Sequence, residues 1–210
     1  MQLHIIGLGV NQQARLEPAA ADALASANLV VGSSRQLQTV VAYLRGPSSP
    51  ETAQSTLAEE RQEQRTLLLP NLKELRVELQ NQQLKGTACV AILASGDPLF
   101  YGIGRWFSNN FEQSQLHFYP AVSSVQAACH RLALSLQDVE VLSLHGRPLE
   151  KIRTLLKRNQ TLVILTDKES TPQILAQECV AAGFPQSQLT VCEALGYDQE
   201  RLRSFSAESL

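Results

Sequence analysis

The residue types best suited to chemistry gather at positions 95–102, with the sequence SGDPLFYG, directly after an apolar run. Gly96 removes a side chain where a ligand could lie against bare backbone. Asp97 stands where a helix N-cap belongs, with Pro98 at the first helical position, so we expect a helix to begin there. Because ligands of open α/β sheets bind at the carboxyl ends of the strands, this loop predicts a binding site.

Capping by Asp97 alone would not require the glycines and aromatic residues that follow it. Gly102 and Gly104 join Gly96 in a short stretch, which indicates backbone that approaches a ligand closely. Phe100 and Tyr101 either line that ligand or lie in the core. The residues themselves leave both interpretations open.

A second glycine-rich turn, Gly7-Leu8-Gly9, follows the first apolar run of the chain. A dinucleotide fingerprint would continue with a third glycine, but Gln12 stands there, and the next strand ends in Gly32 without an acidic residue. We therefore expect neither a nicotinamide nor a flavin cofactor. The turn is either a tight structural connection or part of the lining of a substrate site.

Two arginines lie near strand ends where an acidic ligand could be bound. Arg147 could form a bidentate pair with a carboxylate, and Arg35 could face a polyacidic substrate. Ordinary surface or salt-bridge roles stay open as alternatives. Asp167 and Glu193 end strands and either touch ligand or serve as caps. No residue stands out as a general base, so the catalytic residues stay unassigned.

Composition restricts the class of protein. The chain has 210 residues, of which 44% are hydrophobic and 18% charged, and a net charge of −2, which is typical of a globular protein without a basic surface. We expect no nucleic-acid and no membrane partner. The four cysteines match no zinc or redox spacing, so we expect no metal, and the chain shows no targeting segment. A cytoplasmic location follows as the expectation.

Strand-like and helix-like segments alternate along the chain, which predicts an α/β protein. Strands are expected at residues 3–6, 29–31, 65–69, 88–94, 116–119, 139–144, 161–165 and 189–193. Helices are expected at residues 17–27, 34–44, from 72, from 98, 125–135, 149–157 and 172–182. Residues 46–64 are rich in Pro, Ser, Glu and Gln and are expected to form a loop with one helical piece.

The alternating elements fit either one doubly wound sheet or two smaller α/β lobes. A polar stretch at residues 109–115 is the best candidate linker. We therefore expect an N-terminal lobe at residues 1–112 and a C-terminal lobe at residues 113–210, with a ligand cleft between the two.

The ordered set of motifs resembles the tetrapyrrole methylases, S-adenosylmethionine (SAM) enzymes that methylate corrin and sirohaem precursors. ASGDPLFYGIG resembles their signature loop, and the resemblance covers most of the chain through segments that occur in the family's order: IIGLG, LASANLVVGSSRQL, PAVSSVQAA, LSLHGR and CEALGYDQERL. GSSRQL, LSLHGR and CEALGYDQERL look most like the branch that methylates C5 of a corrin precursor in cobalamin (vitamin B12) biosynthesis.

The resemblance implies a two-lobed α/β fold, a homodimer, and SAM as methyl donor held in the cleft. By position in the motifs, the SAM contacts are expected to be Ser95, Gly96, Asp97, Phe100, Ala121, Ser123, Ser124, His145, Ala194 and Leu195. The residues expected to contact the tetrapyrrole substrate are Gly7, Gly9, Arg35, Tyr101 and Arg147.

The implied activity is methylation of C5 of a precorrin or cobalt-precorrin. Other activities of the superfamily (another ring position, diphthine or ribosomal RNA) are alternatives, as is a non-catalytic binding lobe of a larger fused enzyme. The chain ends at SFSAESL, where family members usually continue into a closing strand, so we expect the C-terminal lobe to be cut short. A fused or separate domain that methylates C15 and decarboxylates is an implied partner.

Overall fold

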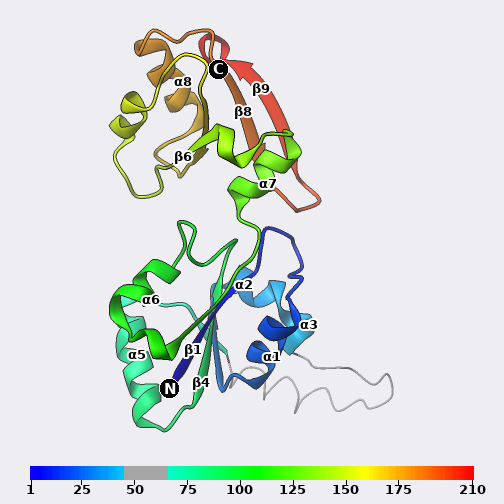
Figure 1. Cartoon of the computed structure of the whole chain (residues 1–210), viewed down its shortest axis with the longest axis vertical. Coiled ribbons are helices and arrows are strands. Elements are labelled where there is room, and N and C mark those ends of the chain that lie inside the picture. The colour runs from blue at the N-terminus through cyan, green and yellow to red at the C-terminus, as the bar shows by residue number, and fades with distance from the viewer. Residues whose placement is uncertain (45–65) are drawn as a thin grey trace. The chain divides into compact units, whose positions relative to one another are not determined.

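The structure, a computed structural model, describes residues 1–44 and 66–210 (Figure 1). The chain forms two compact units, Met1–Ser123 and Ser124–Leu210. The division falls later than the boundary expected after residue 112, because strand β5 (Leu116–Tyr119) pairs with the first unit's sheet. The α/β class is confirmed, the ligand cleft stays a prediction, and the loop expected at residues 46–64 lies outside the described residues.

The first unit is built on a five-stranded parallel sheet in the order β3-β2-β4-β1-β5. Besides β5, its strands are β1 (Gln2–Gly7), β2 (Leu29–Gly32), β3 (Thr66–Leu68) and β4 (Cys89–Ala94). Its helices are α1 (Pro18–Ser26), α2 (Ser34–Thr39), α3 (Val41–Leu44), α5 (Leu72–Leu84), α6 (Gly104–Asn110) and the 3₁₀ turn η1 (Gln113–Gln115). The central strands are apolar at nearly every position because helices cover both faces of the sheet.

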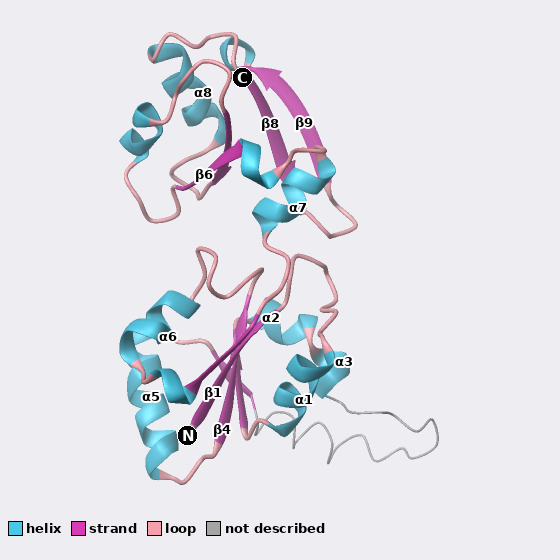
Figure 2. Ribbon diagram, in the orientation of Figure 1, coloured by secondary structure: helices cyan, strands magenta, loops and turns pink. Residues whose placement is uncertain are grey.

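Alternate residues of each strand supply two separate cores. Ile6 and Leu93 join the cluster that contains residues of α1 and lies near α2 and α3. Their neighbours Ile5 and Ile92 join the opposite cluster, which contains residues of α5 and α6. Figure 2 shows these two groups of helices on opposite sides of the sheet. The chain therefore leaves β1 toward one face and the adjacent β4 toward the other, which makes their carboxyl ends the topological switch point where such sheets bind ligands.

The prediction that a helix starts at Pro98 is wrong. Residues 98–103 form turns, and α6 begins only at Gly104. Tyr101 has a φ of 55°, in the left-handed region that a right-handed helix excludes. The loop folds back on itself, and the Gly104 N–H donates to the Pro98 carbonyl at 2.8 Å. A Cβ at Gly102 would lie 2.5 Å from that same oxygen. Chain packing therefore accounts for both glycines without a ligand.

Two of the expected helix starts are confirmed in detail. Ser33 caps α2 and forms a capping box with Gln36, and Asn71 caps α5 by accepting two backbone N–H groups. The helix expected at residues 34–44 is instead divided, because Val40 leaves helical geometry between α2 and α3.

The second unit holds two small sheets. Its elements are α7 (Ser124–Arg131), η2 (Leu136–Asp138), β6 (Val139–Ser143), η3 (Leu149–Thr154), β7 (Thr161–Leu165), α8 (Pro172–Ala181), β8 (Gln188–Glu193), β9 (Arg201–Ser206) and η4 (Ala207–Ser209). β6 and β7 are parallel, whereas β8 and β9 form an antiparallel hairpin. The sequence did not predict β9, because its first four residues are exposed and show no apolar face. Residues 149–154 are 3₁₀ where an α-helix was expected.

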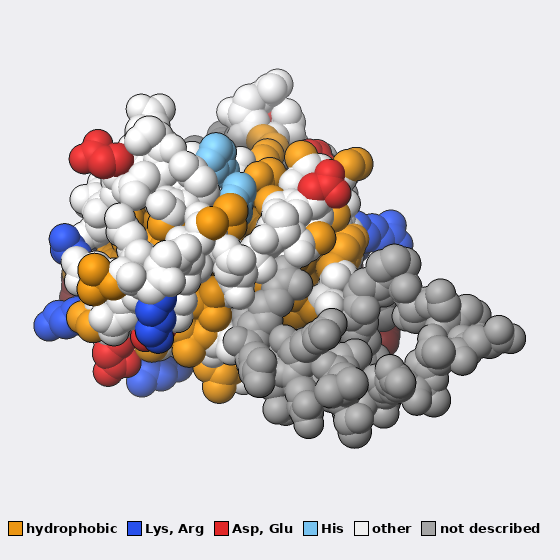
Figure 3. All heavy atoms as spheres, turned by 90° about the horizontal axis from the view of Figure 1, so that it is seen from below, with side chains coloured by type: hydrophobic (Ala, Val, Ile, Leu, Met, Phe, Trp, Pro, Cys, Tyr) orange, Lys and Arg blue, Asp and Glu red, His pale blue; other side chains and the backbone are white. Residues whose placement is uncertain are grey.

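No helix within residues 1–44 and 66–210 is long and apolar enough to cross a membrane. On the face seen in Figure 3, acidic and basic side chains are scattered, and histidine side chains lie beside hydrophobic ones.

His4 and His117 face each other across β1 and β5, with their rings stacked at 5.0 Å. His4 Nδ1 and the Tyr119 hydroxyl are hydrogen-bonded at 3.0 Å, and His117 Nε2 and Gln2 Oε1 at 2.9 Å. Partial burial, and then the neighbouring His117, lower the pKa of His4 below its ordinary value of 6.5. The same burial raises the pKa of Tyr119.

Acidification should therefore weaken the first unit. Below the ordinary histidine pKa, His4 binds a proton in the unfolded chain but not in the folded one. The free energy of unfolding therefore falls as the pH is lowered, until the pH passes the lower pKa of folded His4. Urea unfolding followed by the fluorescence of Trp106, the chain's single tryptophan, should show midpoints that decline from about pH 8 to about pH 5. His4→Gln should flatten this decline, while His130→Gln, in the second unit, should retain it. An unchanged slope in His4→Gln contradicts the assignment.

Candidate functional site

The turns after β1 and β4 are joined by their own backbones at the switch point. The Gly96 N–H donates to the Gly9 carbonyl at 2.9 Å, and the Gly9 N–H donates to the Gly96 carbonyl at 3.4 Å. Gly9 has a φ of 69° and Gly96 a φ of 64°. Residues with a side chain rarely adopt such positive φ values. Gly96 is buried, and its N–H and carbonyl are both used in this pair, so the structure does not show the bare backbone that the sequence predicts at this glycine.

Gly7 lies beneath this pair and is buried. A Cβ there would come within 2.8 Å of the Gly96 carbonyl and 2.9 Å of the Tyr119 carbonyl. Close packing of three chain segments therefore explains this glycine, and it favours the structural interpretation of the first turn.

Ser95 is held by two side chains of α2. The Arg35 Nη2 donates to the Ser95 hydroxyl oxygen at 3.3 Å, and the Gln36 Nε2 donates to it at 3.1 Å. The orientation of the Gln36 amide is fixed, because its Oε1 accepts a hydrogen bond from the Ser33 N–H of the capping box at 2.8 Å. A hydroxyl has two acceptor positions and one hydrogen, so Ser95 is left to donate that hydrogen to an acceptor on a ligand.

Asp97 stabilises its own loop through hydrogen bonds to the backbone. Its Oδ1 accepts the N–H groups of Leu99 and Phe100, at 2.8 and 3.0 Å. The Phe100 and Tyr101 rings meet edge to face at 5.0 Å, and both residues are exposed, at 40% and 45%. The core alternative for these two rings is therefore not supported.

Exposed apolar side chains follow the carboxyl ends of three strands of the first unit. They are Leu68 at the end of β3, Leu99, Phe100 and Tyr101 after β4, and Val122 after β5. Parallel strands place all these ends on one side of the sheet, with β3 and β5 as its two outer strands. The apolar residues 99–101 follow β4, as the polar Ser95 does. Of the other expected contacts near this edge, Ala121 is half-buried, Ser123 is buried, and Ser124 is the exposed first residue of α7.

In the second unit, the turn with His145 and Arg147 is organised by Asp167. Asp167 Oδ2 accepts the Gly146 N–H at 2.9 Å, while Oδ1 accepts the N–H groups of Glu169 and Ser170 and the Ser170 hydroxyl. The Gly146 bond, followed by those from Ser170 and Glu169, holds the pKa of Asp167 well below its ordinary value. His145 and Arg147 are exposed, and Arg147 Nη1 lies 3.5 Å from the Ser143 carbonyl.

The other turn expected to contact SAM is the loop of the β8–β9 hairpin, which contains Ala194 and Leu195. Ala194 has a φ of 50°, a conformation that costs a residue with a side chain about 1–2 kcal/mol. Glu200, at the far end of the loop, accepts hydrogen bonds from the Gly196 N–H and from Arg131 of α7. The bonds from Arg131 and then from Gly196 lower the pKa of Glu200.

The structure thus brings the expected residues together in groups within each unit. In the first unit, Gly7, Gly9, Arg35, Ser95 and Gly96 lie around the ends of β1, β2 and β4. In the second, His145 and Arg147 share one turn and Ala194 and Leu195 share another.

Sequence reasoning missed the residues that hold these loops. Gln36 and Glu200 were not singled out, and the anchoring role of Asp167 was left open beside a ligand contact. The Ser-x-x-Gln capping signature could have identified Gln36. No local pattern identifies Arg131 as a partner of Glu200 or Gly146 as a partner of Asp167, because both lie far away in the sequence.

These residues suit a ligand that has both apolar and acceptor groups. The Ser95 hydrogen and the exposed rings of Phe100 and Tyr101 provide one contact of each kind. Among the described residues, no group of three His, Cys, Asp or Glu is placed to hold a metal ion.

Comparisons with known proteins agree on one family. A model of the family Tetrapyrrole (Corrin/Porphyrin) Methylases matches residues 2–210. The chain is 34% identical over 200 residues to a precorrin-6Y C(5,15)-methyltransferase [decarboxylating] of Sinorhizobium sp, covering 95% of this chain but 44% of the relative. It therefore spans about half the length of that protein.

A shorter relative matches over nearly its whole length. The cobalt-precorrin-7 C(5)-methyltransferase of Salmonella typhimurium is 27% identical over 200 residues, covering 95% of this chain and 88% of the relative. Among solved structures, a uroporphyrin-III C-methyl transferase from Thermus thermophilus, complexed with S-adenyl homocysteine, superposes with a TM-score of 0.68. It is 18% identical, covers 99% of this chain and 89% of that one, and shares the fold.

Asp167→Asn tests the anchor of the turn that holds His145. The variant should melt at a lower temperature than the wild type near neutral pH, because an amide cannot accept all four hydrogen bonds. The low folded pKa means that the wild type keeps this advantage above the ordinary value of 3.8 and loses it as pH falls further. Melts by circular dichroism should therefore converge in acid, with Asp138→Asn, at an exposed acid in the same unit, as control. A difference that persists in acid counts against the anchor.

Proposed function

The chain belongs to the tetrapyrrole methylases, and we propose that it transfers a methyl group from SAM to C5 of a precorrin or cobalt-precorrin in cobalamin biosynthesis. The match to the cobalt-precorrin-7 C(5)-methyltransferase over 88% of that relative's length carries the proposal. The precorrin-6Y relative supports the same ring position. Its name includes both C5 and C15, and this chain matches about half of its length.

The proposed SAM contacts in the first unit are Ser95, Gly96, Asp97, Phe100, Ala121 and Ser123. The hydroxyl hydrogen of Ser95 suits a carboxylate or ribose oxygen, and Gly96 allows the positive φ of the turn beside Ser95. Asp97 acts through the loop, whose N–H groups it binds. Phe100 supplies an exposed ring for an apolar part of the ligand.

The proposed contacts in the second unit are Ser124, His145, Ala194 and Leu195. His145 lies on the turn that Asp167 fixes, and the Ala194 backbone lies on the hairpin loop that Glu200 fixes. Both turns are thus held in one shape before a ligand arrives, which lowers the entropic cost of binding.

SAM supplies an electrophilic methyl group, and the electrons for the new bond come from the reduced tetrapyrrole itself. The protein's task is to orient both ligands and to exclude water, and it needs no strong base among its own residues. The exposed apolar side chains at the sheet edge, among them Leu99 and Val122, serve to exclude water. Gly9, Arg35, Tyr101 and Arg147 are the proposed substrate contacts, and Gly7 supports the turn beside them.

The two arginines select the acidic side chains of the substrate. Arg35 uses one N–H on Ser95, so further guanidinium donors remain for a carboxylate. Arg147 projects from an exposed turn and provides a second site of positive charge. A homodimer, and a fused or separate C15-methylating domain as partner, complete the proposal.

Methyl transfer by this chain alone is the direct test. Incubation with SAM carrying a labelled methyl group and a precorrin or cobalt-precorrin should label C5 only, as read by mass spectrometry and NMR. Label at another ring position, or in diphthine or ribosomal RNA only, would indicate another activity of the superfamily. Binding of SAM without turnover would indicate a non-catalytic lobe, and no binding at millimolar SAM would contradict the proposal outright.

Gly96→Leu separates a binding role of the signature loop from a structural one. A leucine at this buried position of positive φ should displace the turn that carries Ser95, so the Kd for S-adenosylhomocysteine by isothermal titration should rise at least about a hundredfold. Gly86→Leu is the matched control, because Gly86 also has a positive φ, of 80°, but lies in open space after α5. Gly96→Leu should also melt at a lower temperature than Gly86→Leu, because Gly96 is buried and Gly86 is exposed. Equal affinity in both would show that Gly96 is only structural.

A further inference from the structure

We propose that Glu200 is a positioning residue for SAM, which holds the hairpin loop at residues 194–200 in its binding shape. The inference rests on the proposed function, in which Ala194 and Leu195 contact the cofactor. Glu200 itself need not touch the ligand, since it acts through the backbone that it binds.

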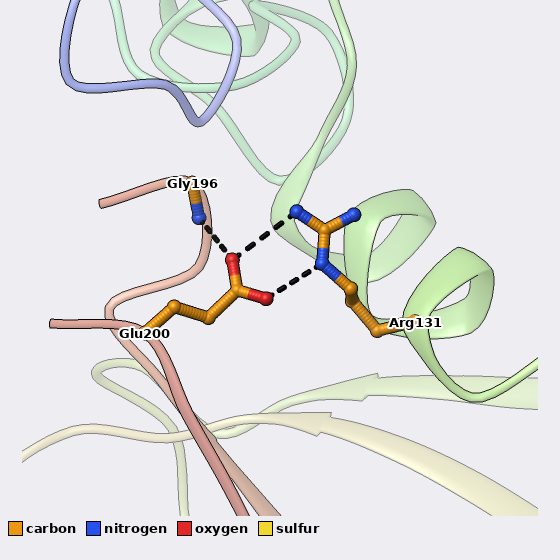
Figure 4. Close-up of polar contacts among 3 residues, drawn as sticks. All are labelled: Arg131, Gly196 and Glu200. Atoms are coloured by element: carbon orange, nitrogen blue, oxygen red, sulfur yellow. Dashed lines mark hydrogen bonds and ion pairs between the residues drawn. The ribbon is translucent and has the colours of Figure 1, made fainter. Parts of the chain in front are cut away.

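One carboxylate joins two segments of the second unit (Figure 4). Arg131 Nε donates to Glu200 Oε1 at 2.6 Å, and Arg131 Nη2 donates to Oε2 at 3.2 Å. The Gly196 N–H donates to the same Oε2 at 2.7 Å. The side-on guanidinium fixes the plane of the carboxylate, and the carboxylate in turn fixes the loop amide.

The loop needs such an anchor because its backbone is not in a relaxed conformation. Ala194 has a φ of 50° and Gly196 a φ of 81°, so two of three successive residues are left-handed. Inside the loop, the Tyr197 N–H donates to the Ala194 carbonyl and the Glu200 N–H to the Tyr197 carbonyl. Without the carboxylate, Ala194 can return to an ordinary φ, and the backbone that faces the cofactor changes direction.

The same carboxylate couples this loop to a second group of proposed contacts. Arg131 is the last residue of α7, and Ser124, another proposed SAM contact, is the first. The ion pair therefore ties the loop with Ala194 to the helix that begins at Ser124. A ligand that contacts both segments depends on their mutual position, which this interaction sets.

The second unit contains a matched ion pair without this connection. Arg153 Nε and Nη2 donate to Glu178 at 2.6 and 3.0 Å, with side-chain exposures similar to those of the Arg131–Glu200 pair. That pair joins η3 to α8. Within the described residues, the Glu178 carboxylate accepts hydrogen bonds from Arg153 and from no loop N–H. It provides a control for the loss of one bidentate ion pair.

Glu200→Gln should raise the Kd for S-adenosylhomocysteine by about tenfold in isothermal titration with the full chain. Glutamine presents an NH₂ group where the carboxylate accepted hydrogen bonds, so a donor then faces either Arg131 or the Gly196 N–H. Glu178→Gln should leave the Kd within about twofold of the wild type. Both variants should lower the melting temperature by similar amounts, which separates positioning from general stability.

Arg131→Met removes the same interaction from the other side and should weaken binding to a similar extent. The double variant Glu200→Gln/Arg131→Met should then show about a tenfold rise rather than a hundredfold one, because both substitutions break one interaction. A Kd for Glu200→Gln within twofold of the wild type, or an equal loss in Glu178→Gln, overturns the inference. Failure of the wild type to bind S-adenosylhomocysteine would instead reject the proposed function.

Discussion

The reciprocal backbone pair of Gly9 and Gly96 is the constraint on which the first unit's site depends. It joins the turns after two adjacent parallel strands whose following helices cover opposite faces of the sheet. The pair requires left-handed backbone on both sides and packs the chain closely over Gly7. Ser95, held from α2, then lies directly beside it. The edge where α/β sheets bind ligands is thus shaped first by backbone, and side chains are added around it.

The acidic residues of the motifs serve mainly to hold loops. Asp97 binds two N–H groups of its own loop, Asp167 organises the turn with His145, and Glu200 connects the β8–β9 loop to α7. Their carboxylates accept hydrogen bonds from these loops, so hydroxyl and aromatic side chains are left for ligands. This division suits the transfer of an activated methyl group to an electron-rich carbon, where orientation matters more than proton transfer.

Family membership points to the reaction, whereas the local contacts show how the loops are held. The family match extends over residues 2–210, and the C5 relative identifies the reaction that we propose. Neither comparison says which side chains keep the loops in shape. The contacts of Gln36, Asp167 and Glu200 answer that question, and they explain why motifs such as GSSRQL and CEALGYDQERL contain polar residues that need not touch the ligand.

Most strands, the helix starts at residues 34, 72 and 172, and the segments of the candidate site could be predicted from the sequence, because each depends on residues close together in the chain. Tertiary packing set the strand order, the delayed start of α6 and the pairing of β9 with β8. It also decided which polar residues anchor loops: Ser95 meets Gln36, Gly146 meets Asp167, and Arg131 meets Glu200. Such pairs join residues remote in sequence, and a local pattern contains no information about which remote segment packing will bring beside it.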